Sequence, residues 1–525
     1  MRYSRLLGRR ASALLAAVAC TMTVLAVSSL PANATPRAAP EAGTGAGTGA
    51  GAVASPTITV PTAGNHGFPF QAEDQAILAG KGYVEREFLF GGTATAYDRD
   101  GTFGSDGNWR VTPGTRAPYQ SRMLVRYPAN PAKFNGTVLV EWFNVSGGID
   151  AQVDWTTMRD EILRSGYAYV GISAQQLGIN ATGAYPGLKA WDPARYGTLS
   201  HPGDQYSYDI FSQAAQALRT PNGPNPLGKL RFSKLLAVGE SQSAMRLTTY
   251  VNAVAPVAQV YDGHLIHSNM AVPTPLGAGL FEAMPNPTLV RTDLKVPTFV
   301  VLTETDMTLH VTARQPDSAT VHTWELAGTS HADQWLLNGM QAVSERMFGG
   351  PVLSRDCGAD TPPVNNGPAH YSLNAALSAM NRWMRGGRAP ATGALLAMEG
   401  NTPVRDPATG LARGGIRLPD VAVPTRTLSG QRHAEGIAAL TCGLFGATDP
   451  WNGDADPWDR HDAGDPSNPT APRTAEPALS QLYPTHTDYV NKVRVAAWTS
   501  VFQGFLTPAD ARAIVTAASR STIGG

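Results

Sequence analysis

One short segment of this sequence places a serine in the local context that nucleophilic catalysis requires. Ser241 lies in the run Gly239-Glu240-Ser241-Gln242-Ser243, between the apolar residues Leu235–Val238 and a helix-like pattern. A sharp turn from a strand into a helix raises a serine hydroxyl above the sheet, and small flanking residues let the two elements approach closely. Ser243 stands where glycine is usual, but serine is also small. The segment predicts that Ser241 is a nucleophile for acyl transfer.

A serine hydroxyl needs a histidine base, and the histidine needs a carboxylate that orients it. The apolar run Pro297–Thr303 ends in Glu304-Thr305-Asp306, and the run Thr323–Leu326 leads into a loop that carries His331. In strand–turn–helix sites of this kind, the acid and then the histidine follow the serine along the chain. The sequence therefore predicts a triad of Ser241, His331 and Asp306, with Glu304 as the alternative acid.

The elements that would bring these residues together begin at about residue 134. We expect strands at 137–143, 167–172, 235–238, 259–266, 297–303 and 323–326, and helices at 154–165, 208–219 and 243–254. Weaker helical patterns follow at 374–385, 489–505 and from 508 onward. Strands that alternate with helices predict an α/β fold, with a mostly parallel sheet and helices on both faces. Each predicted triad residue then follows a strand at the same sheet edge.

Composition excludes some classes of function. Lys+Arg and Asp+Glu each number 41, and no basic run follows the first ten residues, so we expect no nucleic-acid partner. Hydrophobic residues make up 42% of the chain, which is enough for a large core. No phosphate-binding or dinucleotide motif lies on a strand–helix turn, and no H-E-x-x-H occurs, so the sequence implies neither a cofactor nor a metal.

Two other groups of polar residues are interpreted as structural. His264 and His267 are three positions apart on an expected strand, which directs them to opposite faces of the sheet. The acidic segment Asp454–Asp465 lacks the ordered spacing of a calcium-binding loop, so it favours a solvated loop.

The first residues are typical of a targeting segment. Arginines precede the apolar run Ala11–Val27, and Ala32-Asn33-Ala34 matches a cleavage site, so we expect a signal peptide at 1–34 and a secreted protein. A membrane anchor and a lipoprotein signal at Cys20 are the alternatives. Residues 35–56 are rich in Gly and Ala, which predicts a linker. The rest, 57–525, is expected to form one domain, with a core at about 130–345, a C-terminal extension at about 346–525 and no membrane span.

Cys357 and Cys442 would remain after removal of the signal peptide. An even number of cysteines in an oxidising compartment favours a disulfide between them. Two buried free thiols are the alternative. Two cysteines so far apart do not make a zinc site.

At this point the sequence resembles the α/β-hydrolase superfamily, and more closely the exported bacterial proteins called alpha/beta hydrolase domain-containing proteins. The resemblance covers roughly 60 to 520 and implies an eight-stranded sheet and ester hydrolysis, without indicating a substrate. The segments that carry it are 140–147 (VEWFNVSG), 191–197 (WDPARYG), 201–211 (HPGDQYSYDIF), 239–243 (GESQS) and 414–419 (GGIRLP).

The same resemblance implies an oxyanion hole, which needs two N–H donors aimed at the developing negative charge. One donor would come from Gln242, the residue after the serine. The other would come from the loop after the third strand, around Asn144 or Val145. The His-Gly pair that is often found in that loop is missing here.

Together these features predict a secreted serine esterase that forms an acyl-enzyme on Ser241 and acts on a small or polymeric ester. An amidase or peptidase of the same fold and a hydrolase-like binding protein without catalysis are the alternatives. Tyr185, Trp191 and Tyr196 lie in long connections where a lid usually inserts, so they and the Pro-rich C-terminal stretch are candidates for a lid. The oligomeric state is left open.

Overall fold

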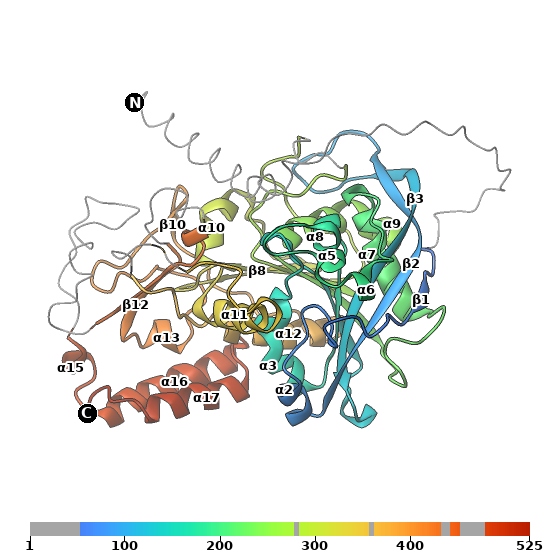
Figure 1. Cartoon of the computed structure of the whole chain (residues 1–525). Helices are drawn as coiled ribbons and strands as arrows, with labels where there is room; N and C mark the ends of the chain where they lie inside the picture. The colour runs from blue at the N-terminus through green and yellow to red at the C-terminus, as the bar shows by residue number, and fades with distance from the viewer. Residues whose placement is uncertain (1–52, 278–282, 356, 358–361, 432–440, 452–477) are drawn as a thin grey trace, which may run out of the picture.

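A computed structural model describes residues 53–277, 283–355, 357, 362–431, 441–451 and 478–525 (Figure 1). The predicted signal peptide, most of the predicted linker and the acidic segment Asp454–Asp465 lie outside the described residues. Packing begins slightly earlier than the predicted Thr57: Val53 packs against the core, and the Ser55 hydroxyl donates a hydrogen bond to the Thr220 carbonyl at 2.8 Å.

Within the described residues, one large sheet of nine strands forms the centre of the molecule (Figure 1). Its order is β1-β2-β3-β5-β4-β6-β7-β8-β9. The six strands from β5 to β9 in this order are parallel, whereas β1, β2 and β3 pair antiparallel. The strands are β1 (Thr57–Thr59), β2 (Tyr83–Arg99), β3 (Val111–Pro128), β4 (Thr137–Trp142), β5 (Ala168–Ile172), β6 (Lys234–Glu240), β7 (Gly263–His267), β8 (Thr298–Thr303) and β9 (Val321–Leu326).

The predicted α/β class with a mostly parallel sheet is confirmed, but the sheet extends further than the sequence indicated. Its strands begin at Thr57 rather than at about 130, because β2 and β3 form a long hairpin in the same sheet. The hairpin is hard to recognise in the sequence because its strands carry buried charged residues. Arg122 pairs with Glu87 and Arg126 pairs with Glu85, each at 2.8 Å. The three-residue β1 adds to its edge and raises the strand number from the expected eight to nine.

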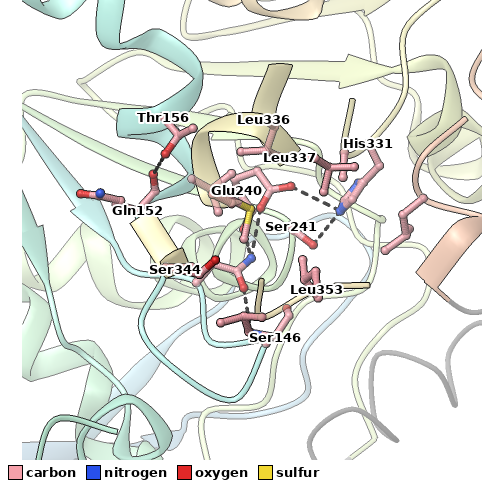
Figure 2. A pocket seen from close by; sticks show the side chains of 18 of the residues that line it. Ser146, Gln152, Thr156, Glu240, Ser241, His331, Leu336, Leu337, Ser344 and Leu353 are labelled. Atoms are coloured by element: carbon pink, nitrogen blue, oxygen red, sulfur yellow. Dashed lines mark hydrogen bonds and ion pairs between the residues drawn. The ribbon is translucent and has the colours of Figure 1, made fainter. Parts of the chain in front are cut away.

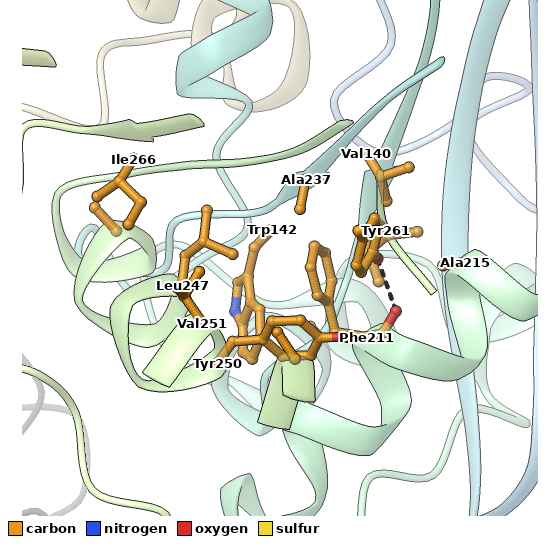
Figure 3. Close-up of a cluster of buried hydrophobic side chains, with 14 of the residues drawn as sticks. Val140, Trp142, Phe211, Ala215, Ala237, Leu247, Tyr250, Val251, Tyr261 and Ile266 are labelled. Carbon is orange, nitrogen blue, oxygen red and sulfur yellow. Dashed lines mark hydrogen bonds between the residues drawn. The ribbon is translucent and has the colours of Figure 1, made fainter. Parts of the chain in front are cut away.

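Helices cover both faces of the sheet, and the strand residues alternate between them. On β6, Leu235 and Ala237 face one hydrophobic cluster, whereas Leu236 and Val238 face the other. The first cluster contains residues of α7 (Ser207–Arg219), α8 (Gln242–Thr249) and the π-helical turn η3 (Tyr250–Val254), and part of it is shown in Figure 3. The second contains residues of α3 (Val153–Ser165), α12 (Ala369–Met384), α16 (His486–Gln503) and α17 (Pro508–Ser519).

The remaining elements are short, with the exception of α11. The helices are α2 (Gln75–Gly80), α4 (Gln176–Asn180), α5 (Leu188–Trp191), α6 (Pro193–Tyr196), α9 (Ala255–Ala258), α10 (Glu304–His310), α11 (Gln334–Phe348), α13 (Pro419–Ala422) and α15 (Leu479–Leu482), with 3-10 turns η1 (Pro131–Lys133), η2 (Asp204–Tyr206) and η4 (Val311–Ala313). Two small hairpins pair β10 (Met398–Glu399) with β11 (Thr402–Pro403) and β12 (Arg426–Ser429) with β13 (Ala447–Pro450).

The C-terminal extension is joined to the sheet by buried polar contacts. The carboxylate of Glu304, at the end of β8, accepts hydrogen bonds from the Arg405 guanidinium at 2.6 Å and from the Gly430 N–H at 3.0 Å. Ile416 continues the sheet beyond β9 through a bridge to Leu326. These contacts make the extension part of the same body as the core.

Two further expectations can be compared with the fold. Cys357 and Cys442 form the expected disulfide, with Cα atoms 5.9 Å apart. Across the described ranges, no helix combines the length and the apolar character that a bilayer span requires.

We predict that Arg405→Met lowers the free energy of unfolding by about 3–5 kcal/mol, because it leaves the buried Glu304 carboxylate without its cation. Chemical denaturation would measure the change. Arg413→Met is the matched control, since Arg413 pairs with Asp406 at the surface and should cost under about 1 kcal/mol. Equal losses in the two variants would contradict the link that we assign to Glu304.

Candidate active site

The turn between β6 and α8 holds Ser241 in a strained backbone conformation. Ser241 has φ +56° and ψ −118°, a combination that non-glycine residues rarely adopt. A Cβ atom on Gly239 would lie 2.9 Å from the Ser243 carbonyl oxygen, so only glycine permits this close approach of strand and helix. The Ser243 hydroxyl braces the turn by donating to the Glu240 carbonyl at 2.8 Å. Serine in place of the usual glycine therefore adds a hydrogen bond here.

The structure brings Ser241, His331 and Asp306 together (Figure 2 shows the first two). His331 Nε2 lies 2.8 Å from Ser241 Oγ, and His331 Nδ1 lies 2.6 Å from Asp306 Oδ1. All three residues are buried. A histidine between a serine hydroxyl and a carboxylate is the arrangement that can remove the hydroxyl proton and stabilise the resulting imidazolium.

The two candidate acids at the end of β8 have different partners. Asp306 Oδ2 accepts hydrogen bonds from the Thr303 N–H and hydroxyl, both at 2.7 Å, so its other oxygen is held toward His331. Glu304 faces Arg405 and the N–H groups of Gly328 and Gly430 instead. The alternative acid therefore has a structural role in the bond to the C-terminal extension.

The two predicted oxyanion donors differ in availability. Gln242 is the first residue of α8, so its N–H has no acceptor within the helix. The Asn144 N–H donates to the Ala151 carbonyl at 3.1 Å, and its side-chain amide donates to Glu240. The Asn144 N–H is therefore already used in a hydrogen bond, and Val145 is the other donor that the resemblance implied for this loop.

A largely apolar cavity of about 170 Å³ borders Ser241 and His331. Figure 2 shows Leu336, Leu337 and Leu353 around the serine. Many apolar wall residues come from α11, which follows His331, from the loop after α11 and from the C-terminal extension: Leu336, Leu337, Met340, Val343, Val352, Leu353, Leu444 and Phe445. The apolar part of this wall is suited to a hydrocarbon-rich group.

The aromatic residues that were expected to form a lid do not line this cavity. Trp191 stacks on His66 with ring centroids 3.8 Å apart, and the Tyr196 hydroxyl donates to Glu87 at 2.7 Å. Both residues belong to a buried cluster that shares Ile149 and Val343 with the cavity wall. Tyr185 donates to the carbonyl of Pro351, which is itself a wall residue. Neither Trp191 nor Tyr196 therefore borders the cavity directly, and much of the predicted Pro-rich stretch lies outside the described residues.

Comparison with models of known protein families gives one match that covers most of the chain. The family model described as "Alpha/beta hydrolase domain" matches residues 53–516. The chain belongs to this alpha/beta hydrolase family. The match begins where the described chain begins and continues into α17, so the C-terminal extension is part of the family's domain.

Solved structures similar to this alpha/beta hydrolase include three esterases, all at low identity. Esterase Est22 is 12% identical, with 61% of this chain and 85% of that chain covered and a TM-score of 0.31. A glucuronoyl esterase from Solibacter usitatus is 11% identical (44% and 55% covered, TM-score 0.23). The rice cell wall degrading esterase LipA from Xanthomonas oryzae is 16% identical (43% and 52% covered, TM-score 0.22). No curated protein sequence matches the chain significantly.

Sequence reasoning missed two residues of the site in this alpha/beta hydrolase. Glu240 Oε1 lies 3.3 Å from His331 Nε2, on the same ring nitrogen that faces Ser241. His267, interpreted from the sequence as structural, accepts the Ser241 N–H at its carbonyl and places its ring 3.2 Å from Asp154. The only signal for Glu240 is its position before the serine, and its contact with His331 depends on long-range packing.

Burial and neighbouring charges shift the titration of these groups. Burial favours neutral His331, but the carboxylates of Asp306 and Glu240 outweigh it and raise the pKa of His331 to about 9. Burial raises the pKa of Glu240 to about 7, although His331 and His267 oppose this. Burial also works against ionisation of Asp306, but His331 and the Thr303 hydrogen bonds hold its pKa below the ordinary value.

Metal ligation is not indicated in the part of the chain that the structure describes, where no three His, Cys, Asp or Glu side chains gather to hold an ion.

We predict that Asp333→Asn becomes more stable relative to the wild type as pH rises from about 6 to about 8. Burial raises the pKa of Asp333 to about 7, so the folded state favours its protonated form. The stability that this protonation provides is complete below the ordinary pKa of 3.8, falls as pH rises above that value, and its last part is lost as pH passes through about 7. The asparagine side chain of the variant cannot ionise, yet it can still accept the Leu336 N–H as the helix cap of α11.

Chemical denaturation at the two pH values would measure this difference. Asp74→Asn is the control, because Asp74 caps α2 in the same way at a more accessible position. A difference between Asp333→Asn and wild type that does not change with pH would contradict the prediction.

Proposed function

We propose that this alpha/beta hydrolase is a secreted serine esterase that cleaves carboxylic esters through an acyl-enzyme. The observation that carries the proposal is the chain of contacts from Ser241 Oγ to His331 Nε2 at 2.8 Å and from His331 Nδ1 to Asp306 Oδ1 at 2.6 Å. The strained turn at Ser241 adds support, because backbone strain of this kind is stored where function requires it.

In the proposed reaction, Ser241 Oγ attacks the ester carbonyl while its proton moves to His331 Nε2. Asp306 orients the ring and stabilises the imidazolium. The oxyanion accepts hydrogen bonds from the N–H of Gln242 and from the N–H of Val145. His331 then protonates the departing alcohol, and a water molecule, deprotonated by the same nitrogen, releases the acid from Ser241.

The apolar wall of the cavity supports an ester with a hydrocarbon-rich acyl or alcohol group. Hydrocarbon buried against Leu336, Leu337 and Met340 would gain about 25 cal/mol for each Å² that leaves water. Export is supported by the arginine-led apolar segment of the first residues and by the Cys357–Cys442 disulfide, since disulfides persist mainly in oxidising compartments.

We predict that a fluorophosphonate probe modifies the purified protein at Ser241, and that Ser241→Ala removes both the adduct and ester hydrolysis, with a loss of at least about 10³-fold in kcat/KM. Peptide mass spectrometry would locate the adduct. Parallel assays with a p-nitrophenyl ester and the p-nitroanilide of the same acid would separate an esterase from an amidase. A folded protein that neither labels nor hydrolyses the ester would contradict the proposal.

We predict that Met340→Trp shifts the preference toward short acyl chains, because the larger side chain fills the cavity beside Ser241. The ratio of kcat/KM for p-nitrophenyl octanoate to that for p-nitrophenyl acetate should fall at least about 10-fold, the effect of one or two methylene groups that no longer fit. Ala342→Trp, on the exposed face of the same helix, is the matched control. The same ratio in both variants would show that this wall does not bind the acyl group.

A further inference from the structure

His331 has a carboxylate at each of its ring nitrogens. Asp306 occupies the Nδ1 side at 2.6 Å, as expected for a triad acid. On the other side, Nε2 is shared between Ser241 Oγ at 2.8 Å and Glu240 Oε1 at 3.3 Å (Figure 2). The nitrogen that would carry the transferred proton therefore faces both the nucleophile and a second acid.

The position of Glu240 is fixed by its surroundings. Its backbone enters the strained turn at Ser241, and the residue is only 3% exposed. The Asn144 amide donates to Glu240 Oε2 and to the Glu240 carbonyl, both at 3.1 Å. One carboxylate oxygen is thus clamped by Asn144, which leaves the other directed at His331. This clamp is the role that the structure gives to Asn144 in place of the predicted oxyanion donor.

We propose that Glu240 is a positioning residue that holds the Nε2 proton of the His331 imidazolium during acyl transfer, and that Asn144 positions Glu240 for this. The inference rests on the proposed esterase function of the same site. Above its pKa of about 7, Glu240 is a carboxylate, and it remains one while the proton moves from Ser241 Oγ to Nε2 and then to the leaving alcohol. No bond to Glu240 forms or breaks.

This arrangement has two opposite consequences for the rate. An ionised Glu240 stabilises the imidazolium that develops in the transition state, so it raises the limiting rate at alkaline pH. The same carboxylate also favours the imidazolium before reaction, so it keeps His331 protonated to higher pH and reduces the fraction of active base near neutrality. Removal of the charge should therefore lower the rate at high pH and move the rise of activity toward lower pH.

Other charged groups near this pair belong to four neighbouring elements. Asp306 on α10 faces His331, His267 on β7 faces Glu240, and Asp154 on α3 contacts His267. Asp333, the cap of α11, also acts on His267. Of these carboxylates, Asp306 and Glu240 are the ones whose charge raises the pKa of His331, which agrees with their contacts to its two nitrogens.

The test is the pH dependence of Glu240→Gln. Glutamine keeps the size of the side chain and can still accept the Asn144 hydrogen bond. The rate of inactivation by a fluorophosphonate and kcat/KM for p-nitrophenyl butyrate would be measured across acid and alkaline pH. We expect the pH of half-maximal rate to fall by about 1 unit and the alkaline plateau to fall about tenfold, which is the equivalent of one pKa unit. The two profiles should therefore converge toward neutral pH.

Two further variants test the assignment of this effect. Asp333→Asn removes a buried carboxylate that faces His267 rather than His331, so its half-maximal pH should match wild type. Asn144→Ala releases the Glu240 carboxylate and should shift the profile in the same direction as Glu240→Gln, but by less. Thermal unfolding would show that each variant is folded, and Glu240→Asp, with its shorter reach, would replace Glu240→Gln if that variant does not fold.

The outcomes separate this inference from the proposed function. If Glu240→Gln leaves the pH of half-maximal rate unchanged, whatever its plateau rate, the proposed role of Glu240 is overturned. The proposed esterase function would still stand. An equal shift in Asp333→Asn would also overturn it, because the effect would then be a general one of buried charge. A wild-type protein that reacts with neither probe nor ester would overturn the proposed function itself.

Discussion

Ser241 is held at φ +56° because Gly239 lets β6 and α8 approach at a distance that no other residue allows. This turn fixes the direction of the Ser241 hydroxyl, and it also fixes the preceding residue, Glu240. Parallel strands bring their carboxyl ends to one edge, so the helix α10 after β8 and the loop after β9 place Asp306 and His331 close together. The remaining contacts of the site orient groups around a hydroxyl whose position the backbone has already determined.

The C-terminal extension depends on the same sheet edge. Glu304 lies two residues before Asp306, and its bond to Arg405 attaches the extension next to the proposed triad. Segments of the extension then complete the cavity wall through Leu444 and Phe445, near the Cys357–Cys442 disulfide. One strand end therefore provides both an acid for the site and an attachment for part of its wall.

The proposed triad could be predicted from the sequence because its signals are local: each of the three residues comes soon after an apolar strand and has a side chain suited to its role. The hairpin of β2 and β3 could not, since Arg122 and Arg126 are buried with carboxylate partners and make the strands look polar. Trp191 was misplaced for a related reason, because the long connection that carries it gives no hint of its stacking on His66. The positions of the hairpin and of Trp191 depend on contacts between distant segments of the chain.

Much of the apolar wall of the cavity comes from stretches of the chain other than the turn that carries the proposed nucleophile. Leu336, Met340, Val352 and Phe445 contribute to the wall, whereas Gly239, Ser241 and Ser243 form the turn. Substitutions in the wall change the space available to a ligand without touching the backbone strain at Ser241. Within such a family, divergence can therefore alter which molecules are accepted while the reactive centre stays under its own, independent constraint.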